Sequence, residues 1–176
     1  SVREAELAMK RRLGASEERI LVAQGNLAST YRMLDRNEEA SRMQREVYSG
    51  RMKLNGEENR DTCTAANNYS SSLVDAKRFE EARSLLRQMI PVAQRVLGDS
   101  DRLMLKMRWM YAQTTCMDDG ATLDDLREAV TALEDAEQTA RRVLGGAQPT
   151  TVGIEESLRE AREILATREM PVRGDA

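Results

Sequence analysis

The 176-residue sequence contains no histidine, and this absence argues against most hydrolases and metalloenzymes. Histidine is the side chain that most often transfers protons near neutral pH, and it is the commonest zinc ligand. Cys63 and Cys116 lie 53 residues apart and form no Cys-x-x-Cys motif, so the sequence predicts neither a disulfide framework nor a metal site. We therefore expect no enzyme, no catalytic residue, no cofactor and a reducing, cytoplasmic location.

Proline, aromatic residues and long apolar runs are also scarce. Three prolines and ten glycines are too few to punctuate a many-stranded β fold, and alternating Val/Ile/Thr-rich runs are missing. Charged residues make up 32% of the chain and aromatic residues only 3%. Alanine, leucine, arginine and glutamate dominate, which favours helices. No run of 18 apolar residues predicts a membrane span. The composition predicts an all-α fold.

The charge is nearly balanced, with 27 basic and 30 acidic residues and a net charge of −3. A protein that binds nucleic acid through phosphate contacts normally carries a basic excess or a basic stripe. We therefore expect neither nucleic acid nor a membrane as a partner.

Internal repetition is the main signal in the sequence. Gly14, Gly56 and Gly98 follow one another at steps of 42 residues, and each comes directly after a Leu or a Leu-Asn pair. Gly145 arrives five residues late. The extra residues lie between Cys116 and Leu126, in a stretch with turn chemistry and a candidate N-cap at position 122. The period therefore indicates repeated structural units, one of them with a lengthened loop.

Each unit divides into two amphipathic helices joined by a short turn. Short joints make the paired helices antiparallel neighbours, and the recurring glycine suits a helix C-cap. A helical pair cannot bury its apolar stripe alone and stacks on the next pair, so the sequence predicts an α-solenoid. The expected helices cover residues 2–13, 17–34, 37–54, 59–76, 79–97, 101–117, 123–144 and 149–168.

Two short segments, Asn26-Leu27-Ala28-x-x-Tyr31 and Glu38-Glu39-Ala40, resemble a tetratricopeptide repeat. The 42-residue period and the Leu-Gly junctions resemble the kinesin light chain type of this repeat. The resemblance implies a right-handed superhelix of antiparallel pairs with about eight helices. It implies a single domain over 1–167, with a second helix of a preceding repeat at 1–14, repeats at 15–56, 57–98 and 99–145, a partial repeat at 146–167 and a flexible tail at 168–176.

The resemblance also implies a function, because first helices of this family line a concave groove that binds peptides. An asparagine amide both donates and accepts, which suits a peptide backbone. Lys106 and Arg32 offer positive charge and Trp109 a large anchor, so an acidic-hydrophobic protein or peptide segment is the expected partner. The candidate groove residues are Asn26, Ser29, Arg32, Asn67, Asn68, Ser71, Lys106, Trp109 and Gln113.

The alternative to a peptide-binding scaffold is a structural segment that self-associates through its terminal helices. Terminal repeats normally need polar capping. At the ends we expect exposed apolar residues that contact neighbouring repeats or a second copy, as in a homo-oligomer: Val2, Leu7, Met9, Ile154, Leu158 and Ile164.

Overall fold

The computed structural model describes residues 2–170, which form eight helices and no strand. The all-α prediction is confirmed, and each predicted helix end lies within two residues of the observed one. The helices are α1 (Val2–Arg12), α2 (Glu17–Met33), α3 (Asn37–Asn55), α4 (Arg60–Asp75), α5 (Phe79–Leu97), α6 (Arg102–Met117), α7 (Leu123–Leu144) and α8 (Pro149–Glu169). Helix α8 continues to Glu169, two residues into the tail expected at 168–176, and residues 171–176 lie outside the described residues.

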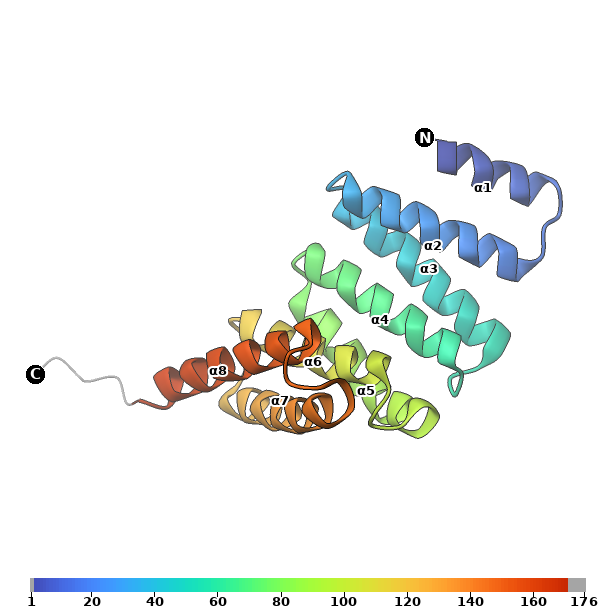
Figure 1. The fold of residues 1–176 in the computed structure, drawn as a ribbon. Coiled ribbons are helices and arrows are strands. Elements are labelled where there is room, and N and C mark those ends of the chain that lie inside the picture. Colours follow the sequence, from blue (N-terminus) through green and yellow to red (C-terminus); the bar gives the residue numbers. More distant parts are fainter. Residues whose placement is uncertain (1, 171–176) are drawn as a thin grey trace, which may run out of the picture. The chain divides into compact units, whose positions relative to one another are not determined.

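The helices fall into two compact units, the first ending at Val96 and the second beginning at Leu97. In the first unit, α2 packs against α1 and α3, and α3 packs against α4 (Figure 1). Small residues allow these helices to approach closely. Ala28 and Ala40 are fully buried, and a side chain at Gly50 would overlap that of Leu21. The apolar core around α2 comprises Leu7, Ala23, Leu27, Tyr31 and Ala40.

The second unit consists of α6, α7 and α8, and each of these helices packs against the other two. Its core includes Leu105, Ala112, Ala129 and Leu133, together with Ile154 and Leu158. The expectation that α8 exposes its apolar residues is therefore wrong for Ile154 and Leu158, which are buried; Ile164 is half-buried. At the other end of the described chain, Leu7 is also buried, whereas Val2 and Met9 are exposed as expected.

The recurring glycines have the backbone conformation that the sequence predicted. Gly14, Gly56, Gly98 and Gly145 have φ angles between 65° and 87°, the left-handed region that ends a helix. A second recurring turn lies inside the helical pairs. Asp35 and Lys77 also have positive φ angles, 57° and 58°, although neither is glycine.

The Gly56→Ala substitution should destabilise the first unit by about 1 kcal/mol, because a β-carbon disfavours this left-handed conformation. There is open space around the position, so the loss measures backbone strain rather than a steric clash. Chemical denaturation followed by circular dichroism measures it. An unchanged free energy of unfolding would contradict the assignment of Gly56 as a left-handed cap.

The lengthened loop of the third repeat ends in the predicted N-cap. The Thr122 hydroxyl accepts a hydrogen bond from the Asp125 amide at 3.1 Å, and the Asp125 carboxylate accepts one from the Thr122 amide at 2.9 Å. This capping box satisfies two backbone amides at the start of α7.

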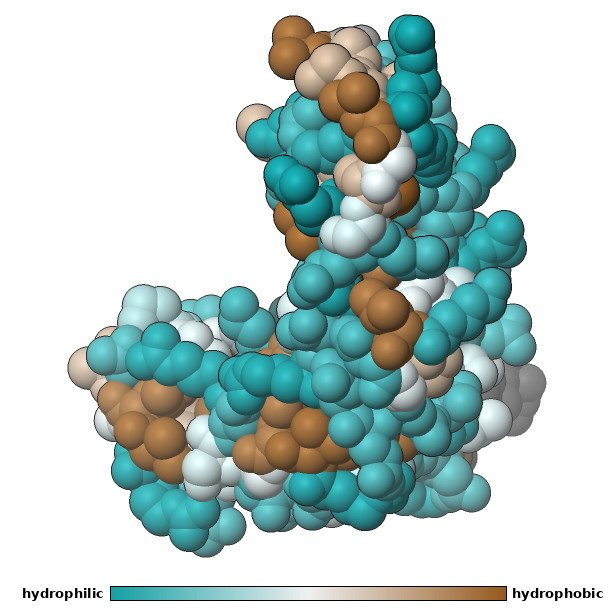
Figure 2. Space-filling model, turned by 90° about the vertical axis from the view of Figure 1, so that its right-hand side faces the viewer, coloured by the Kyte–Doolittle hydropathy of each residue, from teal (hydrophilic) through white to brown (hydrophobic). Residues whose placement is uncertain are grey.

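None of the helices within residues 2–170 has the length and apolar content that crossing a bilayer requires. On the face shown in Figure 2, hydrophobic residues reach the surface in separate patches with hydrophilic side chains between them.

Candidate functional site

A hollow of about 290 Å³ lies in the first unit and is lined by residues of α2, α3 and α4; we call it the α2–α4 hollow. Four of the predicted groove residues line it: Asn26, Ser29, Arg32 and Asn68. Asn26 and Asn68 are exposed on neighbouring first helices, so their side-chain amides are accessible to a ligand. The hollow therefore brings together all the predicted peptide-binding residues of α2 and one of those of α4.

Gly25 opens the α2 side of the hollow. A β-carbon built on this helical glycine meets no heavy atom within 4 Å, so the hollow extends to the helix backbone. The adjacent Ser29 hydroxyl donates to the Gly25 carbonyl at 3.1 Å and keeps its lone pairs as acceptors. A polypeptide backbone could approach α2 more closely here than at a residue with a side chain.

The cations of the hollow are already paired. The Arg32 guanidinium lies 2.6 Å from the Asp75 carboxylate of α4. Arg51, whose side chain is only 12% exposed, lies 3.4 Å from Asp61 and 3.7 Å from Glu18. The positive charge of Arg32, predicted to attract an acidic partner, is thus neutralised by Asp75, 43 residues further along the chain. The hollow offers hydrogen bonds more than net charge.

Asn67 and Ser71 do not line the hollow. Asn67 is 9% exposed, and its Oδ1 has no hydrogen-bond partner within the described part of the chain. Ser71 is half-buried. Gln44, which sequence reading did not select, lies on the α3 side of the hollow with 4% of its surface exposed. It lies on a second helix, whereas the family resemblance pointed only to first helices.

The other three predicted residues lie on α6 in the second unit. Lys106 and Gln113 are exposed, and Trp109 is half-buried. The Trp109 indole donates a hydrogen bond to the Ser157 hydroxyl at 2.8 Å, and the Gln113 amide donates to the same oxygen at 3.3 Å. A β-carbon at Gly153 would lie 2.5 Å from the Trp109 ring. Trp109 therefore packs on α8 through Gly153 and Ser157, two residues that the sequence did not predict as contacts.

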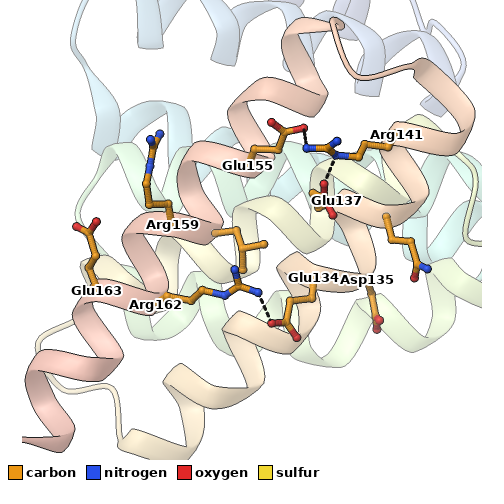
Figure 3. Close-up of a pocket in the computed structure, with 10 residues that line it drawn as sticks. Glu134, Asp135, Glu137, Arg141, Glu155, Arg159, Arg162 and Glu163 are labelled. Atoms are coloured by element: carbon orange, nitrogen blue, oxygen red, sulfur yellow. Dashed lines mark hydrogen bonds and ion pairs between the residues drawn. The ribbon is translucent and has the colours of Figure 1, made fainter.

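A second, larger hollow of about 840 Å³ lies between α7 and α8; we call it the α7–α8 hollow. Figure 3 shows Arg141 between Glu155 and Glu137, and Arg162 directed toward Glu134. Five carboxylates and three guanidinium groups line this hollow, namely Glu134, Asp135, Glu137, Glu155 and Glu163 with Arg141, Arg159 and Arg162. Neither the helical period nor the family resemblance predicted this charged surface.

Neither cysteine has the environment of a reactive thiol. Burial raises the pKa of the Cys63 thiol and that of the Cys116 thiol above the ordinary value, so both stay protonated near neutral pH. Within residues 2–170, no group of three or more His, Cys, Asp or Glu side chains could hold a metal ion.

The family model for the tetratricopeptide repeat matches residues 19–95, the segment that contains the α2–α4 hollow. This segment is therefore similar to the tetratricopeptide repeat. This confirms the resemblance noted in the sequence. Among curated proteins, no sequence matches this chain.

Solved structures extend the tetratricopeptide-like fold over most of the chain. Crystal structures of nearly identical TPR-like repeats assigned to a Podosopora anserina kinesin light chain, one of them a single-substitution variant, superimpose with TM-scores of 0.79 and 0.77. Both share 19% identity with this chain and cover 95% of it, and the chain covers 77% of each of them. At this identity the similarity establishes the fold, which is that of kinesin light chain-like repeats.

Proposed function

We propose that this chain is a protein-interaction scaffold that holds an extended segment of a partner protein in the α2–α4 hollow. The observation that supports it is the pair of exposed amides, Asn26 and Asn68, on either side of a hollow that reaches the backbone at Gly25. Tetratricopeptide repeats generally mediate contacts between proteins, which favours a scaffold over an enzyme. The two unpaired cysteines are in keeping with a cytoplasmic location.

The chemistry of the hollow favours recognition of the partner's backbone. An amide can accept from a backbone N–H and donate to a backbone C=O, and each such bond contributes about 0.5–1.5 kcal/mol. Since Arg32 and Arg51 are already paired with carboxylates, they add little net attraction for an acidic partner. Lys106 on α6, in the second unit, has no ion-pair partner among the described residues, so we propose it as a separate contact for an acidic residue of a partner.

Replacing Asn26 or Asn68 by alanine should weaken binding of a selected peptide about 2- to 10-fold for each substitution, the effect of one hydrogen bond. Peptides are selected from a random display library on the whole chain, and affinity is measured by fluorescence anisotropy. Asn55→Ala, at the end of α3 and outside the hollow, is the matched control and should leave the affinity unchanged. Equal effects of all three substitutions would contradict the proposed site.

Gly25→Ala separates binding from stability. Alanine is favoured over glycine inside a helix by about 0.5–1 kcal/mol, and the added methyl group meets no neighbour, so the first unit should become more stable. The same methyl group occupies the hollow and should weaken peptide binding. Denaturation and anisotropy on one variant measure both effects. A stabilised variant with unchanged affinity would place the peptide elsewhere.

Lys106→Glu tests the role of charge. Affinity for an acidic selected peptide should fall and then recover in part when the peptide's acidic residue is replaced by lysine. The melting temperature should hardly change, because a surface charge substitution usually alters stability by under about 0.5 kcal/mol. If every peptide binds this variant as it binds the parent chain, Lys106 has no part in recognition.

A further inference from the structure

Gln44 occupies a repeat position that holds leucine in the other second helices of the three repeats. The residue twelve positions before the recurring glycine is Gln44 in α3, Leu86 in α5 and Leu133 in α7. Leu86 and Leu133 are fully buried, so this position belongs to the apolar interior of its repeat. The amide of Gln44 therefore stands where the period predicts a leucine.

Burial of this amide has a cost that leucine would avoid. Gln44 is only 4% exposed, and its Oε1 has no hydrogen-bond partner in the part of the chain that the structure describes. A buried acceptor without a partner lowers the stability of a fold, whereas an apolar side chain at the same place does not. Residues that break a local rule in this way are expected at functional sites. Ligand binding therefore explains Gln44 better than folding does.

Gln44 lies where a ligand of the α2–α4 hollow can reach it. The buried residues that line this hollow, and so form its floor, are Leu21, Gln44, Val47 and Ala65. The last torsion of a glutamine side chain is broad, so the amide can turn toward the hollow with little strain. Other residues of the described first unit that have a buried oxygen without a partner do not line the hollow, namely Ser41, Asn67, Ser70 and Ser72.

The surroundings of Gln44 define the chemical group that it can bind. An unpaired carbonyl oxygen needs a hydrogen-bond donor, and a carboxylate offers none at neutral pH. An ammonium or guanidinium group would be costly to bury on an apolar floor without an opposite charge. The nearby carboxylates, Asp75 and Asp61, are already paired with Arg32 and Arg51. An uncharged hydroxyl or carboxamide satisfies the oxygen without burying a charge.

We propose that Gln44 is a specificity-determining residue of the α2–α4 hollow and binds an uncharged hydroxyl or carboxamide on a side chain of the partner segment. This inference rests on the proposed function of the hollow. Asn26 and Asn68 hold the backbone of the segment, and Gln44 selects one of its side chains at the floor. The partner thus supplies the hydrogen bond that the free chain lacks.

The Gln44→Leu substitution tests the proposal, because the other repeats hold leucine at the equivalent position. The variant should melt about 4–8 °C higher than the parent chain, since the unpaired oxygen is removed. It should bind a peptide selected on the parent chain about 10- to 100-fold more weakly, because the donor of the peptide loses its acceptor. Thermal unfolding followed by circular dichroism and fluorescence anisotropy measure the two effects.

A matching change in the peptide should reverse the preference. The peptides come from the random display library, and an alanine scan finds the residue whose removal weakens binding to the parent chain but not to Gln44→Leu. Replacing that residue by an apolar one of similar shape, threonine by valine or asparagine by leucine, should weaken binding to the parent chain about 10- to 100-fold. The apolar peptide should bind Gln44→Leu more tightly than the original peptide does, which is the coupling expected of a direct contact.

Two control variants separate stability from binding. Ser41→Ala removes another buried oxygen without a partner from α3, outside the hollow, and should raise the melting temperature without changing the affinity. Gln88→Leu makes the same exchange as Gln44→Leu at an exposed position of α5 and should change neither quantity. If Gln44→Leu does not fold, Gln44→Met, which keeps an unbranched side chain, takes its place.

The proposal is overturned if folded Gln44→Leu binds the selected peptides as the parent chain does, or if those peptides need no hydroxyl or carboxamide. When Asn26→Ala and Asn68→Ala still weaken binding, such a result removes only the role of Gln44 and leaves the hollow as the binding site. If none of the three substitutions weakens binding, the hollow does not hold the peptide and both proposals fail.

Discussion

Ala112→Arg should unfold the second unit at ordinary temperatures. Ala112 is fully buried in the core that α6 shares with α7 and α8. An arginine here would bury a guanidinium group without a partner and would also force the helices apart. The cost should exceed about 4 kcal/mol, a large part of the roughly 5–15 kcal/mol that stabilises a domain. Loss of helical circular dichroism and a collapsed melting temperature are the expected results.

The control for Ala112→Arg is the reverse change at Arg159, which directly follows Leu158 in α8 as Ala112 follows Tyr111 in α6. Arg159→Ala should alter stability by under about 0.5 kcal/mol, because the side chain is exposed and makes no ion pair within the described residues. The contrast between the two substitutions measures the difference between a buried position of α6 and an exposed position of α8. If Ala112→Arg melted like the parent chain, α6 would not pack on α7 as described.

Trp109→Ala should destabilise the second unit by about 2–4 kcal/mol, through lost packing on α8 and the lost hydrogen bond to Ser157. A Trp109 ring that served only as an exposed binding anchor would cost little stability on removal. Chemical denaturation followed by circular dichroism gives the free energy of unfolding. A loss below about 0.5 kcal/mol, the usual range for a surface substitution, would restore the anchor interpretation.

Gly153→Ala provides the control for Trp109→Ala, because the two positions touch. In the parent chain the new β-carbon would displace the ring, and the strain should outweigh the roughly 1 kcal/mol that alanine gains over glycine in a helix. In the Trp109→Ala background the ring is gone, and Gly153→Ala should become stabilising. Additive effects would contradict direct contact between the two residues.

The helices were predictable because their signals are local. Each repeat ends in a glycine, the residue that most easily adopts a left-handed backbone conformation. The lengthened loop ends in Thr122, and Asp125 follows three positions later to complete the capping box. The left-handed turns at Asp35 and Lys77 escaped prediction, since the residues there are not the glycine that marks such turns.

The candidate site was only partly predictable, because its properties depend on residues that are distant in sequence. The resemblance to the repeat family predicted Asn26 and Asn68 as groove residues, and both line the hollow. It could not reveal that Asp75 neutralises Arg32, or that Gly153 and Ser157 receive the ring of Trp109. The two helices that carry the last contact are separated in sequence by α7, so neither helical period nor composition indicates it.

The capping box at Thr122 makes the preceding loop the natural entry point for engineering. Since Thr122 and Asp125 cap the start of α7, the exposed residues Asp119 and Gly120 have little part in setting the helix register, and the repeat has already absorbed five extra residues in this loop. Ala121, by contrast, is buried, and its carbonyl accepts a hydrogen bond from Arg168 of α8 at 2.8 Å. The junctions at the four glycines have no such freedom, because each ends a helix in one fixed conformation. A short reporter peptide inserted between the exposed residues Asp119 and Gly120 should therefore report on the second unit without disturbing its helices.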